Sequence, residues 1–312
     1  MRTTSERRRT ARNVCYSWKT VFFSVMLTGA LAVPAGVYAQ APGAGSNSLR
    51  NRVAVLEQHV AALEAVLAAL QNNTVLALDG VLVLDTSGIS PIARFTGVNV
   101  QVVNGAGSSS TTNGLGNLIV GYNELPPGNP PGSRNGSHNL VVGRQHQYPS
   151  FGGLVAGFNN VVSGQEASVV GGSLNNANGT WSSVTAGRQN VAIGTHASVT
   201  GGEFNNASGT WASVSGGSAN QAGGDHASVS GGHENFASGV DSSVSGGELN
   251  EARGAQSGVS GGISNLASGR AATVSGGRQN NAGGIDASVS GGQARSAPVQ
   301  DCWKAGSPAD TC

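Results

Sequence analysis

A strict fifteen-residue repeat of apolar and polar positions runs through the second half of the chain. Its valine column consists of Val169, Val184, Val199, Val214, Val229, Val244, Val259, Val274 and Val289. Asparagine follows each of the first eight valines by six positions and alanine follows all nine by eight, from Ala177 to Ala297. Fifteen residues are too few for a pair of helices but can hold two short strands and two turns. The pattern therefore predicts an all-β fold, a parallel β-solenoid of 15-residue coils over residues 151–297.

Within one coil, alternation predicts which side chains point inward. Ala227 and Val229 share one face of a strand, and the serines that alternate with them share the other. Ala237 points inward from the second strand of the coil, so both inward columns are small and the two sheets lie close together. Paired glycines such as Gly231 and Gly232 suit tight corners with positive φ. We expect the asparagine column to form stacked amides or bonds to the backbone at a corner.

A heptad pattern precedes the repeat. Its a positions are Val53, Val60 and Leu67, and its d positions are Leu49, Leu56, Leu63 and Leu70. This narrow seam predicts a coiled coil over residues 48–72. The run from Arg52 to Glu57 resembles a motif of short trimeric coiled coils, whereas valine at a with leucine at d favours a dimer. We expect a homotrimer, with a dimer as the alternative.

Residues 74–150 are rich in β-branched residues but lack the strict period. The motifs Asn117–Gly121 and Asn139–Gly143 repeat the pattern Asn, three apolar residues and Gly. The segment 126–132 between them contains four prolines, which cannot donate to a sheet ladder. We expect an irregular solenoid lead-in at 74–150, with this segment as a loop insertion.

The first 39 residues are typical of an export signal. A basic region precedes the apolar run 21–33, and Val37-Tyr38-Ala39 fits a cleavage site. We therefore expect the mature chain to begin at Gln40, with a linker at 40–47. The run is shorter than the ~20 residues of a spanning helix. Cleavage leaves 11 Lys and Arg against 15 Asp and Glu, a net charge of −4. The sequence thus predicts a secreted or cell-surface protein, with the periplasm as an alternative, and disfavours nucleic-acid binding.

The remaining composition points away from catalysis. The chain has 49 glycines and only 11% charged residues, unlike an ordinary globular enzyme. Candidate carboxylates for a polysaccharide-cleaving β-helix, such as Asp225, Glu234 and Asp241, fall at different phases of the repeat. The histidines show no metal-ligand spacing, and no phosphate-binding loop is present. We expect no enzyme activity, no cofactor and no metal.

Two cysteines close the chain, in a tail at 298–312. Cys302 and Cys312 are separated by nine residues, and in an exported protein this predicts one small disulfide loop. Free or interchain thiols are the alternative.

The repeat resembles a known family. The coil Ala212-Ser213-Val214-Ser215-Gly216-Gly217, with Asn220, Ala222 and Gly224, is similar to the head repeats of YadA-like trimeric autotransporter adhesins. The resemblance covers about residues 151–297 and implies a left-handed parallel β-roll, a trimer and binding of host or surface ligands. The coils here are longer by one residue, and the coiled coil precedes the repeat. Because no C-terminal membrane anchor follows, autotransport is not inferred.

Two tryptophans are the candidate contact residues. Trp181 and Trp211 occupy one column of the repeat, two coils apart. Exposed aromatic rings on a polar rod can bind a sugar or a surface protein, or they can fill the gap between subunits. We therefore predict an adhesin-like or surface-scaffold protein, with a structural spacer that has no ligand as the alternative.

Overall fold

The computed structural model describes residues 47–71, 78, 80–128 and 130–305. The chain divides into two compact units, Met1–Val100 and Gln101–Cys312. The expected signal segment at 1–39 and almost all of the expected linker lie outside the described residues. Among the helices of the described part, none is long and apolar enough to cross a membrane.

The first unit contains the helix that the heptad pattern predicts. Helix α2 (Asn47–Gln71) begins one residue earlier than expected. Its described seam residues are between 50% and 68% exposed: Leu49, Val53, Leu56, Val60, Leu63 and Leu67. A single chain therefore leaves the apolar seam in water, and the coiled coil itself stays a prediction.

The first unit also contains an antiparallel hairpin. Strand β1 (Leu82–Asp85) pairs with β2 (Ile92–Phe95), with Leu82 opposite Phe95. Asp85 accepts hydrogen bonds from the Ser87 amide and hydroxyl and from Arg94, and these bonds lower the pKa of Asp85. This part of the expected lead-in is a hairpin and not a coil, because a polar turn containing glycine reverses the chain directly.

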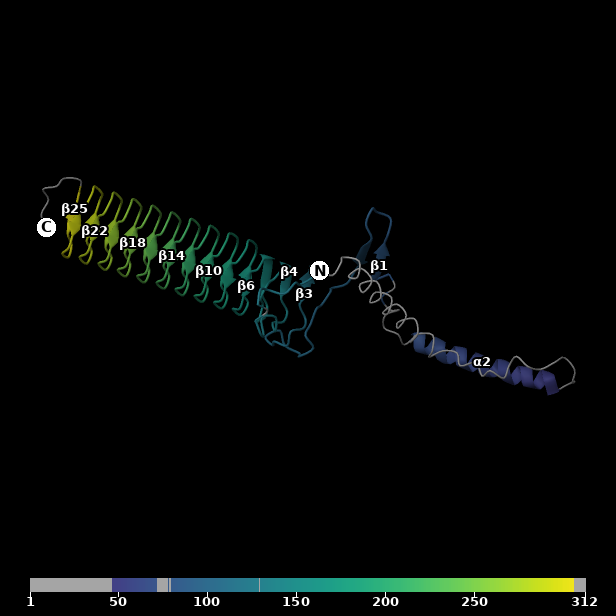
Figure 1. Ribbon diagram of the computed structural model, residues 1–312. Helices are drawn as coiled ribbons and strands as arrows, with labels where there is room; N and C mark the ends of the chain where they lie inside the picture. The colour runs from purple at the N-terminus through teal and green to yellow at the C-terminus, as the bar shows by residue number, and fades with distance from the viewer. Residues whose placement is uncertain (1–46, 72–77, 79, 129, 306–312) are drawn as a thin grey trace, which may run out of the picture. The chain divides into compact units, whose positions relative to one another are not determined.

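The second unit is a parallel β-solenoid, as the repeat predicts, and its coils stack along a rod (Figure 1). One sheet has 13 strands: β3 (Leu118–Val120), β4 (Leu140–Arg144), β5 (Leu154–Phe158), β7 (Ser168–Val169), β9 (Ser183–Val184), β11 (Ser198–Val199), β13 (Ser213–Val214), β15 (Ser228–Val229), β17 (Ser243–Val244), β19 (Gly258–Val259), β21 (Thr273–Val274), β23 (Ser288–Val289) and β25 (Trp303–Lys304). The other has ten: β6 (Val161–Val162), β8 (Asn176–Ala177), β10 (Val191–Ala192), β12 (Asn206–Ala207), β14 (Gln221–Ala222), β16 (Phe236–Ala237), β18 (Glu251–Ala252), β20 (Leu266–Ala267), β22 (Asn281–Ala282) and β24 (Ser296–Ala297). Single-residue bridges from Phe158 to Gln293 form a third ladder.

The lead-in coils are less regular. Strand β3 pairs with β4 across the proline-rich insertion, as expected from the two related motifs. Val141, Val155 and Val169 are paired in register at intervals of 14 residues. Val155 therefore occupies the valine column one coil before Val169, although a period of 15 would place Leu154 there, and the strict period begins at Val169.

Three inward columns form the core. The valines from Val169 to Val289 and the alanines from Ala177 to Ala297 are at most 1% exposed. The third column holds mostly alanine, with Ser182, Ser242 and Ser257 among the exceptions. Small side chains in all three columns let the walls of the coil pack closely, and the predicted inward positions Ala227, Val229 and Ala237 are confirmed.

The corners combine glycines with left-handed residues of other types. The sequence predicts positive φ at the paired glycines, but in one representative repeat only the second glycine of the pair, Gly217, adopts it, with a φ of +84°. Gly224 is needed for space, because a Cβ there would lie 2.0 Å from the carbonyl oxygen of Gly239. Two further corners of the same repeat hold Trp211 at a φ of 61° and Ala219 at 57°. The glycine pattern predicts only the first of these positive φ angles.

Candidate functional site

One corner of the solenoid carries an outward column of aromatic and ionisable side chains. Its members, one per coil, are Glu166, Trp181, His196, Trp211, His226 and Asp241, and each has a φ between 54° and 61°. The backbone amide of each tryptophan donates to a carbonyl of the preceding coil, at 2.9 Å, which fixes the corner. Trp181 and Trp211 are 51% and 54% exposed. The corner thus holds a polar and aromatic column in solvent.

The rings of this column stack on one another. The ring centroids of Trp181 and His196 lie 4.7 Å apart, and those of His196 and Trp211 lie 3.7 Å apart, with interplanar angles of 17° and 6°. His196 therefore fills the space between the tryptophans and covers the ring face that each turns toward the other. The sequence contains this signal, because His196 lies 15 residues from both tryptophans.

Acidic groups lie at both ends of the column. Trp181 Nε1 donates to Glu166 Oε2 at 2.8 Å, and His226 Nδ1 lies 3.5 Å from Asp241 Oδ1. The intervals of 15 residues place these partners on adjacent coils. One connected outward surface therefore consists of Glu166, Trp181, His196 and Trp211.

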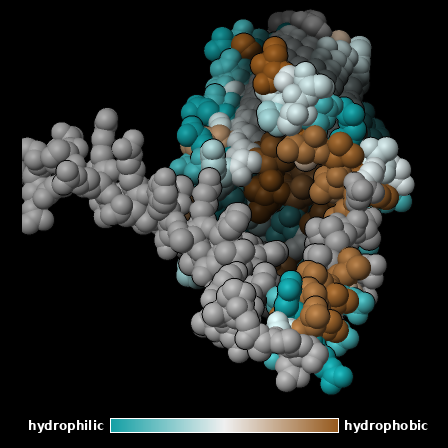
Figure 2. Space-filling view, turned by 90° about the vertical axis from the view of Figure 1, so that its right-hand side faces the viewer, coloured by the Kyte–Doolittle hydropathy of each residue, from teal (hydrophilic) through white to brown (hydrophobic). Residues whose placement is uncertain are grey.

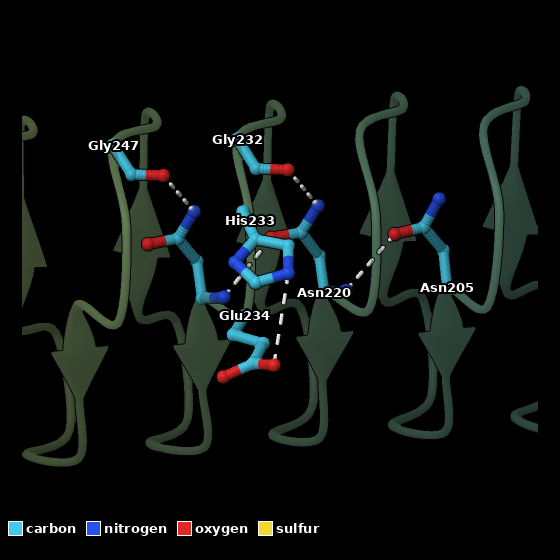
Figure 3. A network of polar contacts seen from close by, with 7 residues as sticks. Asn205, Asn220, Gly232, His233, Glu234 and Gly247 are labelled. Atoms are coloured by element: carbon cyan, nitrogen blue, oxygen red, sulfur yellow. Dashed lines mark hydrogen bonds and ion pairs between the residues drawn. The ribbon is translucent and has the colours of Figure 1, made fainter.

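A column of hydrogen-bonded asparagines, here called the asparagine spine, runs along the solenoid at a different corner of the coil, next to Ala219. Asn220 is 1% exposed, and its Nδ2 donates to the carbonyls of Gly216 and Gly232 at 2.9 Å each. Its Oδ1 accepts from the backbone amide of Asn235 at 3.0 Å, and the same bond recurs from coil to coil (Figure 3). The predicted Asn-backbone bonds are confirmed.

His146 takes the place of asparagine at the N-terminal end of the spine. Its Nδ1 accepts from the Asn160 amide at 3.2 Å, and its Nε2 lies 3.1 Å from the Val142 carbonyl. These two contacts reproduce those of an asparagine amide and require the neutral imidazole with the proton on Nε2. His146 is 1% exposed, and burial lowers its pKa.

A pocket lies beside the N-terminal end of the aromatic column. Ser108–Ser110, Phe151, Gly152 and Glu166 line a volume of about 390 Å³. The serine loop is anchored by a contact of 3.2 Å between the Ser109 carbonyl and His138 Nδ1, and by the Thr111 hydroxyl, which donates to the Ser108 carbonyl. Sequence reasoning missed this pocket, because the serine loop lies outside the repeat.

The candidate carboxylates have separate partners. Asp225 accepts from the Thr210 amide, Glu234 lies 3.6 Å from His233 (Figure 3), and Asp241 faces His226. The structure therefore does not bring these carboxylates together as a general acid and a general base. Among the described residues, no group of three or more His, Cys, Asp or Glu side chains could hold a metal ion.

Cys302 is 4% exposed, in the third inward column of the core. Its expected partner, Cys312, lies outside the described residues, so their pairing stays a prediction.

Comparisons with protein families and with curated proteins find no match. The β-solenoid and its exposed side chains are therefore the features that bear on function.

Proposed function

We propose that this β-solenoid repeat protein is an exported, non-catalytic adhesin-like or surface-scaffold protein that acts as a homotrimer. The observation that carries the proposal is the contrast between inward and outward positions. Valine and alanine recur inside every regular coil and asparagine inside all but the last, whereas the exposed corner changes from Glu to Trp, His and Asp along the rod. A constant core with a varied exposed column suits the display of a binding surface.

Two further observations support self-association and display. The apolar seam of α2 is exposed over its whole described length, and burial against other copies would remove it from water. Further exposed apolar side chains lie in β3, and apolar surface is visible on the side of the molecule seen in Figure 2. The resemblance to YadA-like heads is consistent with a trimer whose surface binds glycans or surface proteins.

The experiment is binding of the mature chain to a glycan array and to immobilised extracellular glycoproteins. A Trp181→Ala/Trp211→Ala variant should lose binding, because it removes both indoles of the exposed column. Trp303→Ala is the matched control, since Trp303 is 62% exposed but lies in β25, outside the column. Circular dichroism of each variant checks that the solenoid remains folded.

The outcomes separate the two candidate functions. Loss of binding in the column variant with retention in the control supports adhesion through this corner. Binding that survives in both variants refutes the role of the column. Absence of binding by the unmodified chain favours the structural spacer, for which the stacked Trp181, His196 and Trp211 rings act only in stabilising neighbouring coils.

A further inference from the structure

We propose that the pocket between the serine loop and Glu166 binds a neutral or amino sugar at the end of a glycan. The proposal deepens the adhesin-like function and rests on it. The volume of about 390 Å³ lies at the lower end of the range of ligand pockets, roughly 300–1,000 Å³. Such a space suits one or two sugar rings and not a protein segment.

The carboxylate of Glu166 is oriented by a hydrogen bond to one of its oxygens, and its other oxygen is available to a ligand. Oε2 accepts the indole N–H of Trp181, which orients the side chain, while Oε1 has no hydrogen-bond partner among the described residues. A carboxylate oxygen forms stronger hydrogen bonds to hydroxyl donors than a neutral acceptor does. Glu166 can therefore accept one or two hydroxyls, or the ammonium group of an amino sugar.

The opposite wall supplies hydroxyl groups and an apolar surface. The hydroxyls of Ser108 and Ser110 lie 3.0 Å apart and bond to each other, while that of Ser109 has no protein partner in the described chain. Phe151 adds an aromatic side chain to the lining. A sugar ring presents this combination of hydroxyls and apolar C–H groups, and aromatic side chains with a few placed polar groups are typical of ligand sites.

Gly152 keeps the pocket open. It has a φ of +70°, and a Cβ at this position would lie 3.2 Å from the Glu166 Cγ. A larger residue would therefore press against the carboxylate side chain and fill space between the two walls.

The charge of the lining selects the class of sugar. Glu166 is the one ionisable residue that lines the described pocket. An anionic sugar would place its carboxylate beside this negative group without a compensating cation. The pocket should accordingly bind uncharged or positively charged sugars and reject acidic ones.

The test is ligand-detected saturation-transfer NMR on the full mature chain. The probes are N-acetylglucosamine, its β1,4-linked disaccharide, galactose, glucosamine and, as the rejected class, sialic acid. Glu166→Gln retains an acceptor for the Trp181 indole and should weaken binding about tenfold or more, since it removes the charged acceptor. Ser109→Trp fills the pocket from its exposed loop and should abolish the signal.

Glu234→Gln is the matched control, because it neutralises an exposed carboxylate far along the rod. It should bind as the unmodified chain does. Three results would overturn the proposal. One is binding by the Glu166→Gln and Ser109→Trp variants as strong as that of the unmodified chain, another is a sialic acid signal as strong as that of neutral sugars, and the third is the absence of a signal with every probe.

The same variants distinguish the pocket from the wider function. If Ser109→Trp keeps full binding on the glycan array while the Trp181→Ala/Trp211→Ala variant loses it, the pocket proposal fails and the adhesin-like function stands. If the pocket binds free sugar in NMR but the unmodified chain binds nothing on the array, the pocket stands and adhesion fails.

Discussion

The asparagine spine offers a direct test of what holds the coils together. Asn220→Ala removes a buried amide from the middle of the rod, where its Nδ2 donates to Gly216 and Gly232 and its Oδ1 accepts from Asn235. The Gly232 carbonyl keeps a second donor, the Ser218 amide at 2.9 Å. The Asn235 amide, in contrast, loses its acceptor inside the core.

The expected cost follows from these contacts. Two lost donor bonds contribute about 1 kcal/mol each, and an orphaned buried amide adds ~1–3 kcal/mol. The variant should therefore be destabilised by about 3–5 kcal/mol. Because coils interact mainly with their neighbours, the loss should first open the rod locally, near the substituted coil.

The assay is guanidinium unfolding followed by circular dichroism, together with hydrogen exchange of the coil amides. Gln221→Ala is the matched control, since Gln221 is the next residue and its side chain is only half-buried. A free energy of unfolding for Asn220→Ala within 1 kcal/mol of the control would refute the structural role of the spine.

The remaining predictions concern two buried polar side chains, Ser242 and His146. Ser242 is 1% exposed, its hydroxyl has no hydrogen-bond partner in the described structure, and most coils have alanine at the equivalent position. Ser242→Ala should stabilise the chain by about 1 kcal/mol, and a lower thermal midpoint would contradict this. Burial lowers the pKa of His146 in the folded chain. Below about pH 6.5 the unfolded chain therefore binds more protons at this residue, and the free energy of unfolding decreases as the pH is lowered. His146→Asn introduces the asparagine that the later coils have at this position. In this variant the free energy of unfolding should decrease less between pH 7.5 and pH 5, and an unchanged decrease would show that His146 does not cause it.

The regular part of the fold is predictable because every coil repeats the same local contacts. Val229 and Ala237 face inward in the sequence pattern and in the structure, since each packs against the same residue type one coil away. The hairpin of β1 and β2 and the register of Val155 were not predicted, because neither belongs to the strict period.

The candidate site was predicted only in part. The repeat places Trp181 and Trp211 in one column, and the same arithmetic would have placed His196 between them. The left-handed φ of Trp211 carries no comparable signal, because glycine marks such a conformation far more often than tryptophan does. The pocket at Ser109 depends on a loop outside the repeat, so no periodic pattern indicates it.

We propose that the chain trimerises through the apolar seam of α2 and that the trimer displays the solenoid. Sedimentation equilibrium of the mature chain tests it, with a Leu56→Asp/Leu63→Asp variant and a Gln58→Asp/Ala61→Asp control that adds the same charges outside the seam. We expect a mass three times that of one chain for the unmodified protein and the control, and a folded monomer for the seam variant. A monomeric unmodified chain, or an assembly that survives the seam substitutions, would contradict it.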